Sequence, residues 1–138
     1  MLTTELITAY LNANYYILEQ EQFKFQIGVY SKDFENLFKQ YNVNNGSFIS
    51  AYNPRSQPTI QIQNKNKHRQ FKNKLLKDNL LFLEAVSTDP AGRWSPEYAF
   101  LVLDINKNKA IQFGISLCQN AIVHIDSKAV PELILVNK

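Results

Sequence analysis

The stretch that decides the fold is Gly92-Arg93-Trp94-Ser95-Pro96-Glu97-Tyr98-Ala99-Phe100-Leu101-Val102-Leu103, in which a polar loop with the only tryptophan runs directly into an apolar strand. An earlier segment has the reverse layout, because the strand-like residues 47–52 stop at Asn53-Pro54-Arg55-Ser56. Loops at the ends of strands commonly carry binding and catalytic residues. These two polar segments are therefore the first candidates for a functional site.

On either side of this stretch, hydrophobic spacing divides the chain into further helices and strands. It predicts helices over residues 3–16, from Ser31 to about 44, 61–78 and 106–117. It predicts strands over residues 22–28, 47–52, 80–86, 98–105, 121–125 and 133–136. The near-continuous apolar run at 80–86 indicates a strand that is buried on both faces.

From residue 47 onward the predicted order is strand, helix, strand, strand, helix, strand. This split β-α-β order is typical of a ferredoxin-like sandwich. We therefore predict an α+β fold in a single domain over residues 1–138. It has a ferredoxin-like βαββαβ core, an N-terminal α-β-α extension and an extra C-terminal strand.

This topology brings the two polar segments together. Strands 47–52 and 98–105 are antiparallel neighbours in it, so the end of the first lies beside the start of the second. If strand 22–28 runs parallel to 47–52, Gly28 ends at the same edge. The edge, called here the strand-end rim, is predicted to collect Asn53, Arg55, Trp94, Glu97, Gln119 and Asn120.

The composition is that of an ordinary globular chain, with 45% hydrophobic and 20% charged residues and a net charge of +3. No apolar window approaches the length of a membrane span, and the first residues lack the pattern of a secretory signal. The single cysteine, Cys118, excludes an internal disulfide and is expected to be a small buried residue. We predict a cytoplasmic domain without membrane association; the oligomeric state stays open.

Sequence motifs for cofactors and metals are absent. With only four glycines, the chain has no glycine-rich phosphate loop and no dinucleotide fingerprint. His68 and His124 have no second histidine, cysteine or carboxylate cluster at ligand spacing. We predict no cofactor and no metal.

Glu97 and Arg55 are the candidates for chemistry at the rim. Partial burial beside an aromatic side chain would raise the pKa of Glu97, which suits a general acid or base. Alternatively, Glu97 forms an ion pair with Arg55 or Arg93 that locks the two segments together. Arg55 suits a phosphate or carboxylate ligand, or else it binds loop carbonyls. Asn53-Pro54 fits a turn, and Trp94 fits either a core aromatic or a stacking platform.

Residues 65–77 contain six lysines or arginines and no acidic residue. A stripe of this kind can neutralise phosphates. The candidate contacts are Lys65, Lys67, Arg69, Lys72 and Lys74. Against this, the strands lack the aromatic-rich signature of an RNA-recognition motif. The alternatives are a solvated helix face with Phe71 and Leu75 inward, or an Asn66–Arg69 pair that points to the rim.

Several segments in matching order resemble a known family. They are Glu5-Leu6 with Tyr10 and Tyr15, Gln26-Ile27-Gly28, Ala51-Tyr52-Asn53-Pro54-Arg55-Ser56, Asn66 with Arg69, Trp94 with Glu97 and Phe100-Leu101-Val102, and Gln119-Asn120-Ala121-Ile122. Over nearly its whole length the chain resembles the bacterial domain-of-unknown-function family numbered 3293. It departs from that family at Ala99, where a serine is expected, and at Gln26, where an arginine is expected. The resemblance implies a small cytosolic bacterial domain and supplies no activity.

The function predicted from these observations is a binding module for a small anionic or nucleotide-like ligand at the strand-end rim. Three alternatives stay open. A nucleic-acid-binding domain would use the basic helix at 65–77. An enzyme would use Glu97 as general acid or base and Arg55 as an anion clamp. A protein-interaction module would use a free edge strand near residues 133–136.

Overall fold

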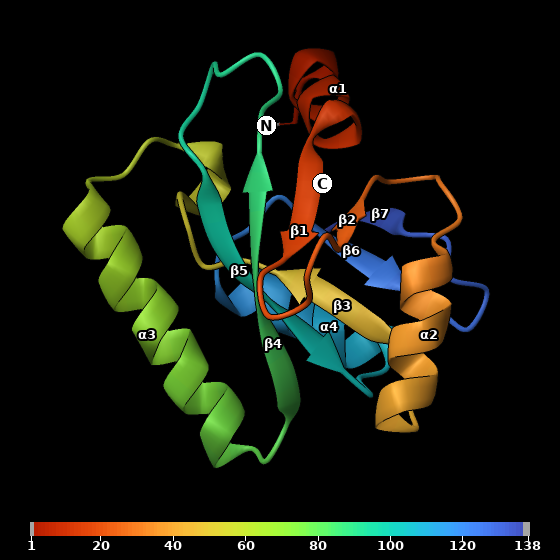
Figure 1. The fold of residues 1–138 in the computed structure, drawn as a ribbon. Coiled ribbons are helices and arrows are strands. Elements are labelled where there is room, and N and C mark those ends of the chain that lie inside the picture. The colour runs from red at the N-terminus through yellow and green to blue at the C-terminus, as the bar shows by residue number, and fades with distance from the viewer. Residues whose placement is uncertain (1, 137–138) are drawn as a thin grey trace.

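The computed structural model describes residues 2–136, which form one antiparallel sheet of seven strands with four α-helices (Figure 1). The strand order across the sheet is β2-β1-β4-β5-β3-β6-β7. In chain order the elements are α1 (Thr4–Asn12), β1 (Asn14–Ile17), β2 (Lys24–Phe25), α2 (Lys32–Tyr41), β3 (Gly46–Ile49), the 3-10 turn η1 (Pro54–Ser56), α3 (Gln61–Lys77), β4 (Leu81–Thr88), β5 (Glu97–Leu103), α4 (Lys107–Ser116), β6 (Ala121–Ile125) and β7 (Glu132–Leu135).

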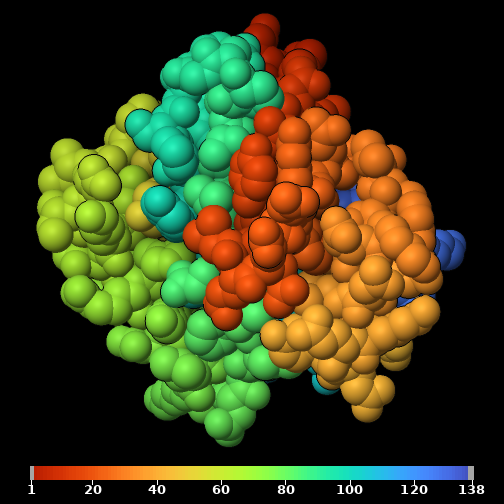
Figure 2. All heavy atoms as spheres, viewed as in Figure 1, coloured from red at the N-terminus to blue at the C-terminus, as the bar shows by residue number. Residues whose placement is uncertain are grey.

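Apolar side chains fill both faces of the sheet. On one face, Phe71 of α3 and Phe113 of α4 pack against Phe100 of β5 and its neighbours. On the other face, Phe34 of α2 packs in a second cluster that includes Phe48 of β3. Figure 1 shows α3 and α2 on opposite flanks of the sheet, and Figure 2 shows residues from the N-terminal third of the chain lying over the front of it. Neither face of the central strands is therefore open to solvent.

The mixed α/β character expected from the sequence is confirmed. The predicted antiparallel pairing of the two polar-ended strands is confirmed as well, since Ile49 of β3 lies opposite Phe100 of β5. Ser31 caps α2 as its sequence indicates, because its hydroxyl accepts a hydrogen bond from the amide of Phe34 at 3.2 Å. The last two strands form the expected antiparallel pair, with Val123 opposite Leu133.

The N-terminal prediction is wrong in two places. The helix ends at Asn12 rather than near residue 16, and residues 14–17 form β1 instead. The side chains of Tyr15 and Ile17 are buried and those of their neighbours are half-buried, and this alternation is the period of a strand. Tyr15 lies opposite Ser87 of β4. The predicted strand 22–28 is reduced to the two residues of β2, because the chain turns on both sides of it.

Gly28 does not reach the strand-end rim. Its left-handed backbone (φ 83°) turns the chain after β2, and its amide donates to the carbonyl of Pro131 at 2.8 Å. Pro131 lies in the connection between β6 and β7. This connection leaves β6 at the end that is distant from the rim. The prediction that Gly28 joins the rim is therefore wrong.

Three smaller differences concern strand ends and burial. β3 stops at Ile49 because the Ser50 hydroxyl donates to the carbonyl of Tyr98 at 2.7 Å and accepts from the amide of Tyr52 at 3.0 Å. These bonds replace the next ladder bonds. β4 is buried on both faces only in its second half, since Leu81 is 42% exposed. Cys118 is exposed rather than buried, because it lies beyond the end of α4 in a left-handed turn (φ 57°).

Candidate ligand-binding site

The strand-end rim forms where β3 ends and β5 begins. Because these strands are antiparallel neighbours, the chain leaving β3 meets the chain entering β5. The side-chain amide of Asn53 donates to Oε2 of Glu97 at 2.6 Å, although 44 residues separate them. The predicted meeting of the two polar segments is therefore confirmed.

Asn53 is held in place by hydrogen bonds with the carboxamide of Asn64. Its backbone amide donates to Oδ1 of Asn64 on α3 at 2.9 Å, and Nδ2 of Asn64 donates back to Oδ1 of Asn53 at 2.8 Å. The same Oδ1 accepts from the amide of Thr59 at 3.0 Å. Asn53 has a left-handed backbone (φ 45°), a conformation that asparagine tolerates better than most residues. Asn53 thus joins the loop after β3 to the first turns of α3.

The 3-10 turn after Asn53 contributes Ser56 rather than Arg55 to the site. The Ser56 hydroxyl forms a 2.7 Å hydrogen bond with the hydroxyl of Tyr10 on α1 and accepts from Nδ2 of Asn120 at 2.9 Å. Arg55 is exposed, and it is anchored through its backbone amide, which donates to the carbonyl of Cys118 at 2.7 Å. The side chain of Arg55 does not line the cavity described below.

Asp89 organises the loop that carries Trp94. The side chain of Asp89 is 2% exposed and accepts hydrogen bonds from the amide of Ala91 at 3.0 Å and from the amide of Arg93 at 2.9 Å. The Arg93 guanidinium binds both carboxylate oxygens, and this partner holds the pKa of Asp89 low, at about 2. Trp94 follows directly and packs against the core cluster on the α2 face of the sheet.

A cavity of about 730 Å³ lies between these segments and α1. Four of the six predicted rim residues line it, namely Asn53, Trp94, Glu97 and Gln119. Asn120 is buried next to this wall at Ser56, and Arg55 lies outside the lining. Five further aromatic side chains line the cavity, namely Tyr10, Tyr15, Phe48, Tyr52 and Tyr98.

Glu97 is the carboxylate of this cavity. Burial raises its pKa, and the hydrogen bond from Asn53 partly opposes that shift. Among residues 2–136, no lysine, arginine or histidine lies within ion-pair distance of Glu97, and Arg93 is instead paired with Asp89. The ion pair of Glu97 with Arg55 or Arg93, expected as one alternative, is therefore not formed. Burial also raises the pKa of the Tyr10 and Tyr15 hydroxyls, and the nearby Glu97 adds to both shifts.

Glu97→Gln tests this electrostatic description without a ligand. A carboxyl group whose pKa is raised by folding stabilises the fold while it is protonated, and that contribution is lost as the pH rises through the folded-state pKa. Glutamine keeps an oxygen acceptor for Asn53 and removes the charge. We expect the variant to melt at the same or a higher temperature than the wild type at pH 8, with the difference shrinking toward pH 4. Thermal unfolding followed by circular dichroism measures this.

The matched control is Glu21→Gln, at an exposed turn position. We expect the difference in melting temperature between this variant and the wild type to stay small and constant across the same pH range. A Glu97→Gln variant that is clearly less stable than the wild type at pH 8 would show that the ionised carboxylate stabilises the fold, contrary to our description.

The sequence interpretation missed Asn64, Tyr10 and Ser56 as members of the site. Tyr10 occurs within the segments that resemble the family but was not assigned to the rim, and Ser56 lies in a polar segment of the predicted rim but was not singled out as a site residue. Asn64 had a detectable signal. It lies on the inward stripe of α3, four residues before His68 and seven before Phe71, where an apolar side chain is expected. A carboxamide on such a stripe indicates a buried polar contact.

The basic helix is separate from this site. Arg69 donates to the side chain of Asn66 at 2.9 Å in an exposed contact, so this pair does not point to the rim. Within the described part of the chain, no three His, Cys, Asp or Glu side chains come together as metal ligands. No helix among residues 2–136 is long and apolar enough to span a membrane.

The fold and the cavity define a small mixed α/β protein with a candidate binding site at the ends of its central strands. Residues 49–122, more than half of the chain, match the family described as "Protein of unknown function (DUF3293)", and the chain belongs to that family. This confirms the family resemblance found in the sequence. The match runs from the end of β3 to β6 and contains all six predicted rim residues. No curated protein and no solved structure matches the chain.

Proposed function

We propose that this protein is a binding module for a small molecule, held in the cavity at the strand-end rim with Glu97 as its main polar contact. The observation that carries the proposal is a partly buried carboxylate in a cavity wall with no cationic partner among residues 2–136. A partly buried carboxylate with one amide donor and no cationic partner is costly while it is ionised. A ligand that supplies hydrogen-bond donors to Glu97 would remove much of that cost.

The size and lining of the cavity support a small-molecule ligand. A volume of about 730 Å³ falls within the range of roughly 300–1,000 Å³ that is common for ligand sites. Such sites combine apolar and aromatic walls with a few polar groups that orient the ligand. Here Tyr52, Tyr98 and Trp94 supply aromatic wall, and Glu97 supplies a fixed acceptor.

The charges favour a neutral or cationic ligand over an anionic one. Arg55, the expected anion clamp, lies outside the cavity lining, and Arg93, which is part of the lining, is paired with Asp89. Glu97 would repel a phosphate or carboxylate while it is ionised. In place of the anionic ligand expected from the sequence, we therefore propose a ligand with a nitrogen donor on a planar or cationic group, such as a nucleobase, an amidine or an amine. Aromatic faces attract such groups, by cation–π contact in the case of cations.

The backbone of the turn beside the cavity supports a functional role. Asn53, Arg55 and Ser56 all have left-handed backbone conformations, with φ between 45° and 58°. Such conformations cost roughly 1–2 kcal/mol for a residue with a side chain, and they cluster at ligand clamps and active sites. The hydrogen bonds of Asn64, Tyr10 and Asn120 hold this turn in place.

A ligand panel read by thermal shift tests the proposal. We expect stabilisation of several degrees by members of a set containing nucleobases, nucleosides, amidines and aromatic amines, because a ligand at 100 times its Kd adds about 2.7 kcal/mol to the free energy of unfolding. Nucleoside monophosphates, citrate and inorganic phosphate serve as the anionic comparison set. Titration calorimetry on any hit then gives the Kd.

Two variants connect a hit to the cavity. Glu97→Gln is expected to weaken binding at least tenfold, since it replaces a charged acceptor by a neutral amide. Glu21→Gln, which removes an exposed carboxylate elsewhere, is expected to leave the Kd unchanged. Stabilisation by anions alone, or a hit whose Kd is the same in the Glu97→Gln variant, would contradict the proposal.

Catalysis by Glu97 is the second use that this geometry allows, because burial raises its pKa toward the range of a general base. The cavity lining of the described residues contains no histidine, cysteine or second carboxylate to act with it. Arg55 lies outside the lining, so the anion clamp of the enzyme hypothesis has no support. Binding without chemistry is therefore the function that we propose.

We also infer that β3, α3, β4, β5, α4 and β6 form a ferredoxin-like unit. The order β4-β5-β3-β6 and the antiparallel pairing of these strands support this assignment, as does the packing of α3 and α4 in one core cluster. The bacterial origin and the cytoplasmic location that the sequence indicates stay predictions.

A further inference from the structure

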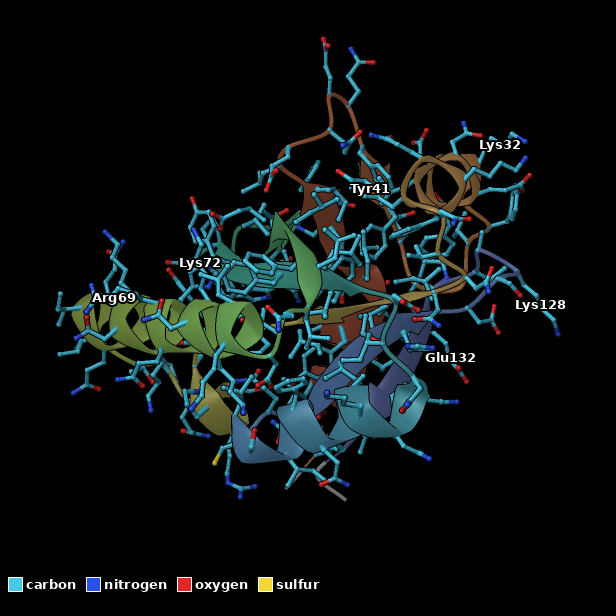
Figure 3. All side chains as sticks on the ribbon, turned by 90° about the horizontal axis from the view of Figure 1, so that it is seen from below. Lys32, Tyr41, Arg69, Lys72, Lys128 and Glu132 are labelled. Atoms are coloured by element: carbon cyan, nitrogen blue, oxygen red, sulfur yellow. The ribbon has the colours of Figure 1, made fainter. Side chains whose placement is uncertain are left out.

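The outer surface of α3 carries side chains that donate hydrogen bonds, and every charged one among them is positive. Over its central turns the exposed side chains are all cationic or carboxamides, namely Lys65, Lys67, Arg69, Gln70, Asn73 and Lys74. The apolar side chains of the same turns, Phe71 and Leu75, are 3% and 0% exposed and belong to the core. Figure 3 shows α3 standing at one side of the molecule, with Arg69 and Lys72 labelled on it.

Most of this positive charge is not neutralised within the described chain. Lys72 lies 3.7 Å from Glu84, and Lys74 lies 3.2 Å from Asp78. The other four cations of the helix, Lys65, Lys67, Arg69 and Lys77, have no acidic side chain of residues 2–136 within ion-pair distance. From Lys65 to Lys77 the helix rises about 18 Å, a length over which duplex DNA carries roughly ten phosphate charges.

We propose that α3 is a contact surface for the phosphate backbone of a double-stranded nucleic acid. Lysine, arginine, asparagine and glutamine side chains all donate hydrogen bonds to phosphate oxygens, which position a protein on a duplex without reading its sequence. The helix lies at the flank of the molecule, where its outer side is accessible along its central turns. The contact residues are Lys65, Lys67, Arg69 and Lys77, with Gln70 and Asn73 as neutral donors.

Other polyanionic partners fit this surface less well. An anionic membrane binds basic helices that also insert an apolar face, and the apolar face of α3 is buried in the core. An acidic protein partner usually needs an apolar anchor at the centre of its interface, whereas Ile62 and Leu76, the exposed apolar residues of α3, lie near its two ends.

A single strand is also a poorer fit than a duplex. Proteins that bind single strands stack the bases on aromatic side chains, and no aromatic side chain of α3 is exposed. The sheet face that RNA-recognition motifs use for stacking is covered here by α2 and the N-terminal strands, which leaves Phe48 5% exposed and Leu101 fully buried. Binding through α3 alone therefore predicts a backbone contact that depends on salt and little on sequence.

The test is fluorescence anisotropy with a labelled 20-base-pair duplex of mixed sequence, titrated with the full chain at 25–200 mM KCl. With four unneutralised cations the slope of log K against log[KCl] is expected near −3.6, so that affinity falls roughly 100-fold between 50 and 200 mM. The triple variant Lys65→Gln, Lys67→Gln and Arg69→Gln is expected to reduce the slope to about −0.9. At 50 mM its affinity should be lower by roughly 100- to 1,000-fold.

The matched control removes the same charge elsewhere. Lys24→Gln, Lys109→Gln and Lys128→Gln combine three exposed positions outside α3, and this variant should bind the duplex within about threefold of the wild type. Circular dichroism checks that both triple variants fold.

Four results would overturn the proposal: no duplex binding by the wild type at 25 mM KCl, equal losses in the two triple variants, tighter binding to the matching single strand, or equally tight binding to polyglutamate. None of these substitutions touches a residue that lines the strand-end cavity, so failure here leaves the proposed small-molecule site standing.

Discussion

Asn64→Ala is expected to lower the free energy of unfolding by about 2–4 kcal/mol. Asn64 is 5% exposed, and its carboxamide accepts from the amide of Asn53 and donates to the side chain of Asn53 and to the carbonyl of Thr59. Alanine leaves these partners partly buried with fewer hydrogen bonds, and the cost of such unmade bonds exceeds the net worth of the bonds themselves. Urea unfolding followed by tryptophan fluorescence measures the change, with Trp94 as the only tryptophan.

The same helix offers a matched control. Asn66→Ala makes the same substitution two residues later, where the carboxamide is bonded only to the exposed guanidinium of Arg69 in the structure described here. We expect this variant to stay within about 0.5 kcal/mol of the wild type. Equal losses in the two variants would mean that helix propensity, rather than the buried carboxamide pair, determines the effect.

The Asn64 variant also has a functional consequence. Asn64 holds Asn53, and Asn53 donates to Glu97 at 2.6 Å, so the acceptor for the proposed ligand loses its orienting contact. We expect the fraction of Asn64→Ala protein that remains folded to bind the ligand more weakly than the wild type. A variant that is less stable but binds with an unchanged Kd would place the carboxamide pair outside the binding function.

Phe34→Ala is expected to cost about 3–5 kcal/mol, the largest single effect that we predict. The Phe34 ring is fully buried and lies 4.9 Å from the ring of Phe23 and 4.8 Å from that of Phe25, both at edge-to-face angles. It joins α2 to β2, which is an edge strand of the sheet and pairs with β1. Loss of the ring leaves a cavity between α2 and the aromatic side chains of the N-terminal segments. Chemical denaturation measures the cost.

Two further variants serve as comparisons for the loss of stability in Phe34→Ala. Phe34→Leu retains much of the volume, and its expected cost is below about 1.5 kcal/mol. Ile115→Ala, which truncates a side chain of α4 that is 50% exposed, is expected to change stability by less than about 0.5 kcal/mol. If Phe34→Ala costs no more than Ile115→Ala, the α2 face of the sheet is not part of the cooperative core.

The part of the fold after residue 46 could be predicted from the sequence because its elements have strong, separate periodicities. The apolar run of β5 is short and follows a proline-containing loop, which favours a strand, and the inward residues of α3 recur at helical spacing over 17 residues. The N-terminal part could not, since β1 has four residues and β2 has two. Tyr15 continues the helical spacing of Tyr10 and Leu11, so the pattern alone does not reveal the end of the helix. Pairing with β4 determines that residues 14–17 are extended.

The candidate site, like the fold, could be predicted from the sequence only in part. Antiparallel pairing of β3 and β5 follows from the element order, and it was enough to predict that Asn53 and Glu97 meet. The direction of Arg55 was beyond sequence reasoning, because it depends on three left-handed backbone conformations in the turn from Asn53 to Ser56. The contribution of Tyr10 depends on how α1 lies over the strand ends, which no local pattern encodes.

The amino-acid sequence by itself determined the family, the order of elements from β3 onward and the location of the strand-end rim. Local periodicity and turn residues carry that information, and they act over distances of a few residues. Only the tertiary structure decided that Glu97 lines a cavity and that its carboxylate has no cationic partner among residues 2–136. It also decided that Arg55 lies outside the cavity lining. The physical reason is that charge pairing and burial depend on contacts between residues far apart in the chain. Glu97 is bonded to Asn53, 44 residues earlier, and Arg93 is held by Asp89 instead.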